Sequence, residues 1–139
     1  MHHTIELAPR PDDIDNLGHV SNLVYVRWIL EVALSHSDAV GWDHAAYVRL
    51  GAIWVVRRHE IDYLSSVLPE QRVALTTWVE AVKGVSSIRR TSMRRLSDNV
   101  EVCRATSTWA FIDLVTGKPR KVTDEVRAAF PIAAVAGAS

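Results

Sequence analysis

The sequence predicts one α+β domain in which a long central helix is wrapped by an antiparallel sheet of about five strands. Its 139 residues, 48% of them hydrophobic, suit a single domain with one buried core, so we expect residues 1–139 to form one unit. Residues 22–40 contain neither Pro nor Gly and are mostly apolar, which favours a helix. Beyond residue 51 the pattern changes to alternating, β-branched and aromatic residues, which favours strands.

The N-terminal segment predicts a short strand followed by a polar loop. Residues 3–7 suit a strand, and Pro9 and Pro11 end it. The next residues, 10–21, are rich in Asp, Asn and Gly, which is typical of a loop.

The long helix is expected to begin at Asn22, a good N-cap residue, and to stop near Gly41. Its polar residues Arg27, Glu31 and Ser35 recur every four positions and form one narrow stripe. A helix that is apolar around the rest of its circumference is a buried helix, so we expect the strands to enclose it.

Four strands joined by short turns are expected after the helix, over residues 51–64, 72–82, 85–96 and 100–115. Lys83-Gly84 suits a tight reversal, and residues 97–99 and 116–119 are turn clusters. A last helix is expected over residues 123–130, with Thr123 as its N-cap. Because such a sheet cannot both enclose the helix and cover its own edges, we expect a homodimer or homotetramer.

The composition of the chain indicates which partners and which cellular location to expect. The 16 basic and 16 acidic residues balance, which argues against wholesale binding of nucleic acid or an anionic membrane. The only cysteine, Cys103, cannot form an intrachain disulfide, and we see no export signal, so a cytoplasmic location is expected. The longest apolar stretch is shorter than the roughly 20 residues of a membrane span.

The polar loop before the helix carries the strongest chemical signal. Asp15 and His19 are four residues apart, just before a helix start whose unpaired N–H groups can stabilise a developing oxyanion. A carboxylate there can attack a carbonyl carbon or deprotonate a water. His19 can orient substrate or carry a proton. The residues alone favour a plain turn, in which Asp15 accepts loop N–H groups, His19 bonds across the loop and Asn22 only caps the helix.

Several further chemistries fit less well. No serine has an evident His/Asp partner, and no phosphate-binding glycine motif is present. The histidines lack metal-ligand spacing, so we expect neither a metal nor another cofactor. Strand alternation places Arg89 with Met93 on one face and Arg90 with Arg94 on the other, and an outward subset can meet coenzyme A phosphates or remain plain solvated surface. Cys103 suits a small core position.

The segment Asp13-Ile-Asp-Asn-Leu-Gly-His-Val-Ser-Asn22 resembles the signature D-x-D-x-x-G-H-V-N-N of the 4-hydroxybenzoyl-CoA thioesterase group of the hotdog superfamily. The resemblance covers about residues 3–130 and implies the hotdog fold. It assigns Asp15 as the catalytic carboxylate and Asn22 as the helix-start residue whose N–H polarises the thioester carbonyl. It also implies substrate contacts at Gly18 and Val20, and at Lys83 and Ser86 in the turn between the strands expected over residues 72–82 and 85–96.

The segment is also similar to that of plant fatty acyl-carrier-protein thioesterases, with which Asp15 and His19 align. Two departures matter: Leu17 replaces the plant enzymes' Asn, which favours the CoA-thioesterase mechanism, and Ser21 replaces the usual Asn. The resemblance therefore implies hydrolysis of an acyl-CoA thioester, with an acyl-carrier-protein thioester as the second candidate substrate. The residues also leave open a hotdog enoyl-thioester hydratase or dehydratase and a non-catalytic acyl-thioester binder.

Overall fold

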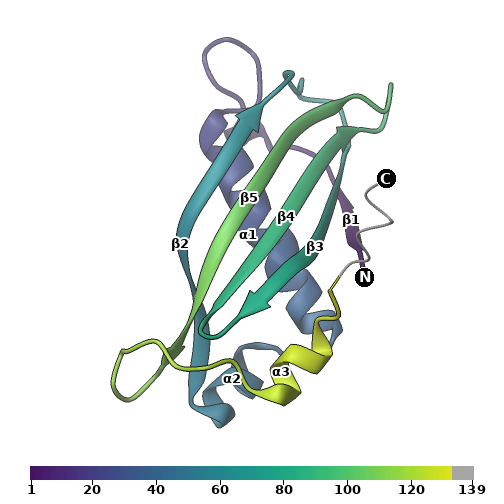
Figure 1. The fold of residues 1–139 in the computed structure, drawn as a ribbon. Coiled ribbons are helices and arrows are strands. Elements are labelled where there is room, and N and C mark those ends of the chain that lie inside the picture. The colour runs from purple at the N-terminus through teal and green to yellow at the C-terminus, as the bar shows by residue number, and fades with distance from the viewer. Residues whose placement is uncertain (133–139) are drawn as a thin grey trace.

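The computed structural model describes residues 1–132, which form a five-stranded antiparallel sheet and three α-helices (Figure 1). The strands lie in the order β1-β3-β4-β5-β2, so β1 and β2 are the sheet edges. Their bounds are β1 His3–Leu7, β2 Ala52–Tyr63, β3 Val73–Lys83, β4 Ser86–Arg95 and β5 Glu101–Asp113. The predicted α+β class, the five strands and their antiparallel pairing are confirmed.

One long helix, α1 (Asn22–Ala39), lies along one face of the sheet (Figure 1). Two short helices, α2 (His44–Leu50) and α3 (Asp124–Ala129), lie together at the lower end in that view. Thr123 caps α3 through its hydroxyl, as expected, because that oxygen accepts from the N–H of Val126 at 3.2 Å. Helix α2 was not anticipated, although Asp43 is a good N-cap and accepts from the N–H of Ala46 at 2.9 Å.

The expectation that the strands bury α1 on nearly every side is wrong for the single chain. Leu23 and Leu34 are 80% and 62% exposed, and Glu31 is exposed beside them. The buried face, which packs on the sheet, comprises Val24, Tyr25, Trp28, Ile29, Val32, Ala33 and His36. A five-stranded sheet curves over only one side of the helix, so residues 1–132 leave the leucines of the other side uncovered.

The core has two apolar parts separated by a polar layer. The upper cluster contains Trp28, Leu75 and Met93, whereas the lower cluster contains Val79 and Phe111. Between them, strands β3, β4 and β5 turn polar residues inward, and these are Thr77, Thr91, Arg89 and Ser107. The inner face of the sheet therefore changes from apolar to polar and back to apolar along its length.

Several local expectations are confirmed. Gly84 has φ +58° in the tight turn between β3 and β4. On β4, Arg89 is buried whereas Arg90 is exposed, as the alternation predicted. Cys103 is fully buried on β5. Within residues 1–132, no helix is long and apolar enough to cross a membrane.

Candidate functional site

The polar loop that precedes α1 is fastened to the helix by a partly buried ion pair. Pro11–Asp13 form a short 3-10 helix, and the Asp13 side chain is 3% exposed. Both carboxylate oxygens of Asp13 accept from the guanidinium of Arg27, each at 2.9 Å. The Arg27 hydrogen bonds hold the pKa of the Asp13 carboxyl below its usual value. Because Arg27 lies on α1, this pair fixes the loop relative to the helix start.

Asp15 occupies the exposed part of this loop and organises it. Its Oδ1 accepts from the N–H of Leu17 at 2.9 Å and from the N–H of His19 at 3.3 Å. The Asp15 N–H donates to the His19 carbonyl at 2.8 Å, and Gly18, at φ +80°, lets the chain turn back. The turn-forming interpretation of Asp15 is thus realised, but only Oδ1 is used. Among residues 1–132, Oδ2 has no hydrogen-bond donor, and Asp15 is an exposed residue.

The N-cap of α1 lies one residue before the expected position. Ser21, not Asn22, is the N-cap, because its backbone is extended and its hydroxyl accepts from the N–H of Leu23 at 3.3 Å. Ser is as good a cap as Asn, and Asn22 instead takes the first helical position. The Ser21 carbonyl accepts from Val24, and the N–H of Asn22 has no acceptor among the described residues. That N–H is available to an external oxygen at the positive end of the helix dipole.

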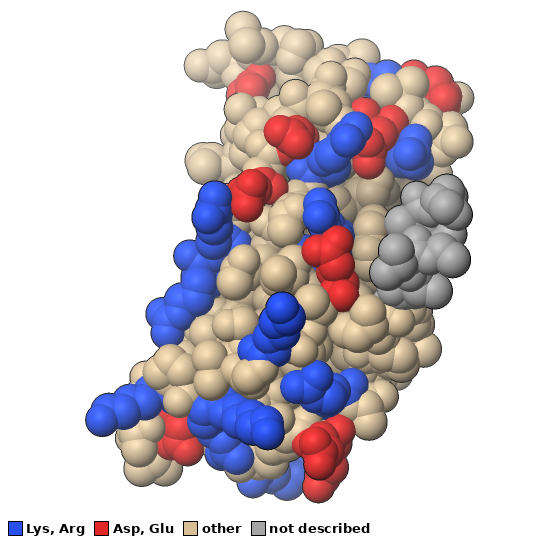
Figure 2. All heavy atoms as spheres, in the orientation of Figure 1, with Lys and Arg blue, Asp and Glu red and all other residues tan. Residues whose placement is uncertain are grey.

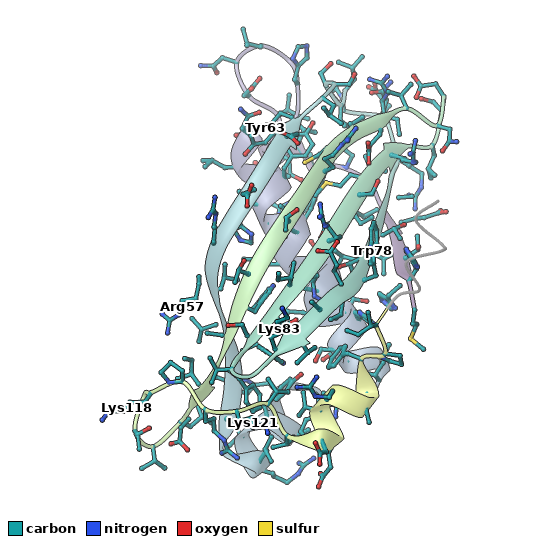
Figure 3. The ribbon with its side chains drawn as sticks, viewed as in Figure 1. Arg57, Tyr63, Trp78, Lys83, Lys118 and Lys121 are labelled. Atoms are coloured by element: carbon teal, nitrogen blue, oxygen red, sulfur yellow. The ribbon has the colours of Figure 1, made fainter. Side chains whose placement is uncertain are left out.

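Tyr63, at the end of β2, was missed by sequence reasoning. Its hydroxyl donates to the Asn22 carbonyl at 3.5 Å, and its ring packs edge-on against Tyr25 at 5.5 Å. Figure 3 shows Tyr63 at the upper end of the molecule, where the loop and the start of α1 lie. The alternating pattern of β2 predicted a strand residue here but gave no signal that this strand end reaches the helix start.

The sequence-predicted site residues fall into two groups. Asp15, Gly18, His19, Val20 and Asn22 lie at the upper end, and there the Val20 side chain is 4% exposed and belongs to the upper core cluster. Lys83 and Ser86 pair across the β3–β4 turn at the lower end. At about 1.5 Å rise per residue, the 18 residues of α1 span roughly 27 Å. One chain therefore does not bring the two groups together.

Basic side chains gather at the lower end. Lys83, Lys118 and Lys121 are exposed, and Figure 3 shows them near the β3–β4 turn and the segment before α3. Figure 2 shows that Lys and Arg predominate over the lower half of this face, where fewer acidic residues lie among them, whereas acidic and basic residues mix more evenly in the upper half. Such a concentration of positive charge favours a phosphate-bearing ligand at the lower end.

This sheet, wrapped over one side of a long helix whose N-terminus meets a polar loop, defines a hotdog-fold protein. The chain belongs to the Thioesterase-like superfamily, whose family model matches residues 9–130. The match spans the loop, α1 and all strands after it, so the resemblance drawn from residues 13–22 is confirmed at the level of the family.

Individual relatives agree with this family. An oleoyl-acyl carrier protein thioesterase of Arabidopsis thaliana is 27% identical over 103 residues, which are 70% of this chain and 28% of the plant protein. The chain therefore spans less than a third of that relative's length. A DHNA-CoA thioesterase from Staphylococcus aureus superposes with a TM-score of 0.83 at 19% identity, over 92% of this chain and 87% of its own.

An acyl-ACP thioesterase from Bacteroides thetaiotaomicron superposes with a TM-score of 0.79 at 25% identity. That superposition covers 87% of this chain and 49% of the Bacteroides chain. The similar proteins thus include thioesterases named for coenzyme A and others named for a carrier protein.

Proposed function

We propose that this protein hydrolyses acyl thioesters, with the Asp15 carboxylate as nucleophile or general base. The observation that carries the proposal is that the loop and the helix start that follows it each keep one unused group, the Asp15 Oδ2 and the N–H of Asn22. The helix start stabilises the negative charge that develops on the thioester oxygen, while the carboxylate acts on the carbonyl carbon or on a water. Family membership supports the same reaction.

The surrounding residues have positioning roles in this proposal. The Asp13–Arg27 pair holds the loop, and two loop N–H groups bond Oδ1 of Asp15, which leaves Oδ2 without a donor among residues 1–132. His19, half-buried in the loop, shapes the site and orients substrate or water. Gly18 and Val20 contribute through the backbone of the same turn.

The assembly that fits this site is a dimer formed through the free edge of β2, either alone or within a tetramer. Strand β2 is 12 residues long and has no partner on its outer side among residues 1–132. Antiparallel pairing of two such edges about a two-fold axis sets the upper end of one chain beside the lower end of the other. Asp15 of one protomer then approaches Lys83 and Ser86 of its partner, whose basic surroundings suit the phosphates of the thiol carrier.

Coenzyme A is the carrier we favour. Leu17 departs from the plant carrier-protein enzymes at the position where they have Asn. The lysines at the lower end suit the several phosphates of coenzyme A, although a phosphopantetheinyl carrier offers one phosphate as well. This choice of carrier is tested by measuring kcat/KM for the same acyl group on coenzyme A and on acyl carrier protein.

The test of the activity is a hydrolysis panel of short-chain, long-chain and aromatic acyl-CoA thioesters with the purified protein. Release of free thiol from at least one of them is the expected result. An enoyl-CoA in the panel distinguishes hydrolysis from hydration, since hydration without thiol release would indicate a hydratase. Tight binding without turnover across the panel would indicate a non-catalytic binder.

A mixing experiment tests the shared site. Asp15→Asn and Lys83→Glu each impair a different contributor, so each homodimer should lose most of its activity. After subunit exchange at equal amounts, half of the dimers hold one intact site, and recovery of about a quarter of parental activity is expected. No recovery after proven exchange would contradict a site built from two chains.

A further inference from the structure

We infer that the pocket at the C-terminal end of α1 binds a ring-sized organic carboxylate, with Arg89 as the anion-recognising group. The pocket lies at the opposite end of α1 from Asp15, between α1, α2, α3 and the inner face of the sheet. Ligand binding to this pocket can be measured directly. The result does not depend on whether the protein hydrolyses thioesters.

The size and lining of the pocket set the class of ligand. Its volume is about 120 Å³, and its aromatic lining residues are Trp42, Tyr47, Trp54, Trp109 and Phe130. An engineered apolar cavity of about 150 Å³ holds one benzene molecule, so this pocket suits a single six-membered ring or a short aliphatic chain. Leu34, which is 62% exposed, and the exposed Asp38 and Arg127 stand at its mouth, so a ligand can enter from solvent.

Arg89 gives the pocket a buried positive charge without an anionic partner. It is 7% exposed, and its Nη1 donates to His36 Nδ1 at 2.9 Å and to Thr77 Oγ1 at 3.1 Å. No carboxylate of residues 1–132 forms an ion pair with it. Burial lowers the pKa of Arg89 to about 10, so it remains charged at neutral pH. A guanidinium so placed is suited to receive an anion.

The hydrogen bonds of Arg89 leave part of its guanidinium group without an acceptor. Burial and the Arg89 charge lower the pKa of His36 to about 4, so His36 is neutral and accepts at Nδ1. The Nε and Nη2 atoms of Arg89 have no acceptor among the described residues. Their N–H groups match the two oxygens of a carboxylate.

Trp109 supplies a second and independent donor. Its indole Nε1 is buried and has no hydrogen-bond partner among the described residues, although Trp109 lines the same pocket. Arg89 pairs with Ser107 on β5, two residues from Trp109, and Ser87 pairs with Trp109, so Arg89 and Trp109 are diagonal neighbours on the inner face. A carboxylate that reaches Arg89 can also accept from this indole, while its ring packs among the aromatic side chains.

Calorimetric titration of the full chain with sodium benzoate and with benzyl alcohol tests the inference. Both probes carry the same ring, and only benzoate is charged. We expect the parent to bind benzoate at least about tenfold more tightly than benzyl alcohol. Arg89→Met should abolish that preference by weakening benzoate binding far more than benzyl alcohol binding, and Trp109→Phe should weaken benzoate binding severalfold.

The matched control is Arg90→Met, which removes the neighbouring guanidinium on the exposed face of β4 and should change neither affinity. Equal binding of the two probes by the parent, or no binding of either, would overturn the inference. So would unchanged benzoate affinity in Arg89→Met protein that circular dichroism shows to be folded. If Arg89→Met does not fold, the comparison of probes on the parent and the Trp109→Phe variant decide the question.

Discussion

At the scale of single residues, the geometry of the site depends on three side chains of the loop. Asp13 holds the loop to α1, Asp15 organises the loop with one oxygen and keeps the other free, and Ser21 caps the helix. The motif predicted that these positions matter, but it did not distinguish the two aspartates physically. The difference lies in burial, since Asp13 is enclosed beside Arg27 and Asp15 is exposed.

Removing the partner of Asp13 should loosen the loop and lower stability. Arg27→Met leaves a nearly buried carboxylate without its guanidinium, which typically costs about 3–5 kcal/mol. Because the Arg27 side chain is 40% exposed, we expect about 2 kcal/mol in the free energy of unfolding. Urea denaturation measures this, with Arg58→Met, at an exposed ion pair, as the control expected to cost below about 0.5 kcal/mol.

The buried His36 should make stability fall on mild acidification. Burial lowers its pKa in the folded protein from 6.5 to about 4, so the unfolded chain takes up a proton that the folded chain excludes. The free energy of unfolding should therefore decrease from pH 6.5 down to pH 4, by roughly 2 kcal/mol from this residue.

The same measurement on His36→Asn should give a shallower decline over that range. Burial also lowers the pKa values of His3 and His59, so part of the slope should remain. An identical slope in parent and variant would show that His36 does not carry the effect.

At the scale of elements, the sequence pattern located every strand because burial on one face imposes alternation. The β3 and β5 bounds differ from the expected ranges by at most two residues at each end. Helix α2 was not predicted because it is short and is flanked by residues that favour loops. The exposed side of α1 was mistaken for a buried one, because Leu23 and Leu34 look the same in sequence whether their cover comes from this chain or another.

Because Ser21 and not Asn22 caps α1, truncating these two side chains should affect stability differently. Ser21→Ala removes the hydroxyl that accepts from Leu23 and should lower the free energy of unfolding by about 1 kcal/mol. Asn22→Ala, at the first helical position, should change it by less than about 0.5 kcal/mol. Chemical denaturation of the two variants checks this, and the reverse order of effects would restore Asn22 as the cap.

At the scale of the whole molecule, we propose that the two ends of one chain contribute complementary parts of a thioester site, which edge pairing of β2 would join. Arg57 marks a place to test that pairing. The register between β2 and β5 shifts from Val56 to Arg58, so Arg57 has no partner on β5. Figure 3 shows Arg57 on the outer edge of β2.

Arg57→Pro should therefore block pairing with a second chain while the pairing with β5 survives. Sedimentation should give the parent two or four times the chain mass of 15.5 kDa, and the proline variant a smaller assembly with an unchanged circular dichroism spectrum. Arg57→Ala is the control that should keep the parental mass. A folded proline variant of parental mass would exclude this edge as the interface.

Whether Asp15 carries out thioester hydrolysis, as we propose, is tested by comparing kcat for the best acyl-CoA substrate in the parent and in Asp15→Asn. Asp12→Asn, at a neighbouring exposed carboxylate in the same loop, serves as the control. Loss of a general base or nucleophile predicts a decrease of about 10²–10⁴-fold for Asp15→Asn and little change for Asp12→Asn. Parental kcat in folded Asp15→Asn protein would contradict the account.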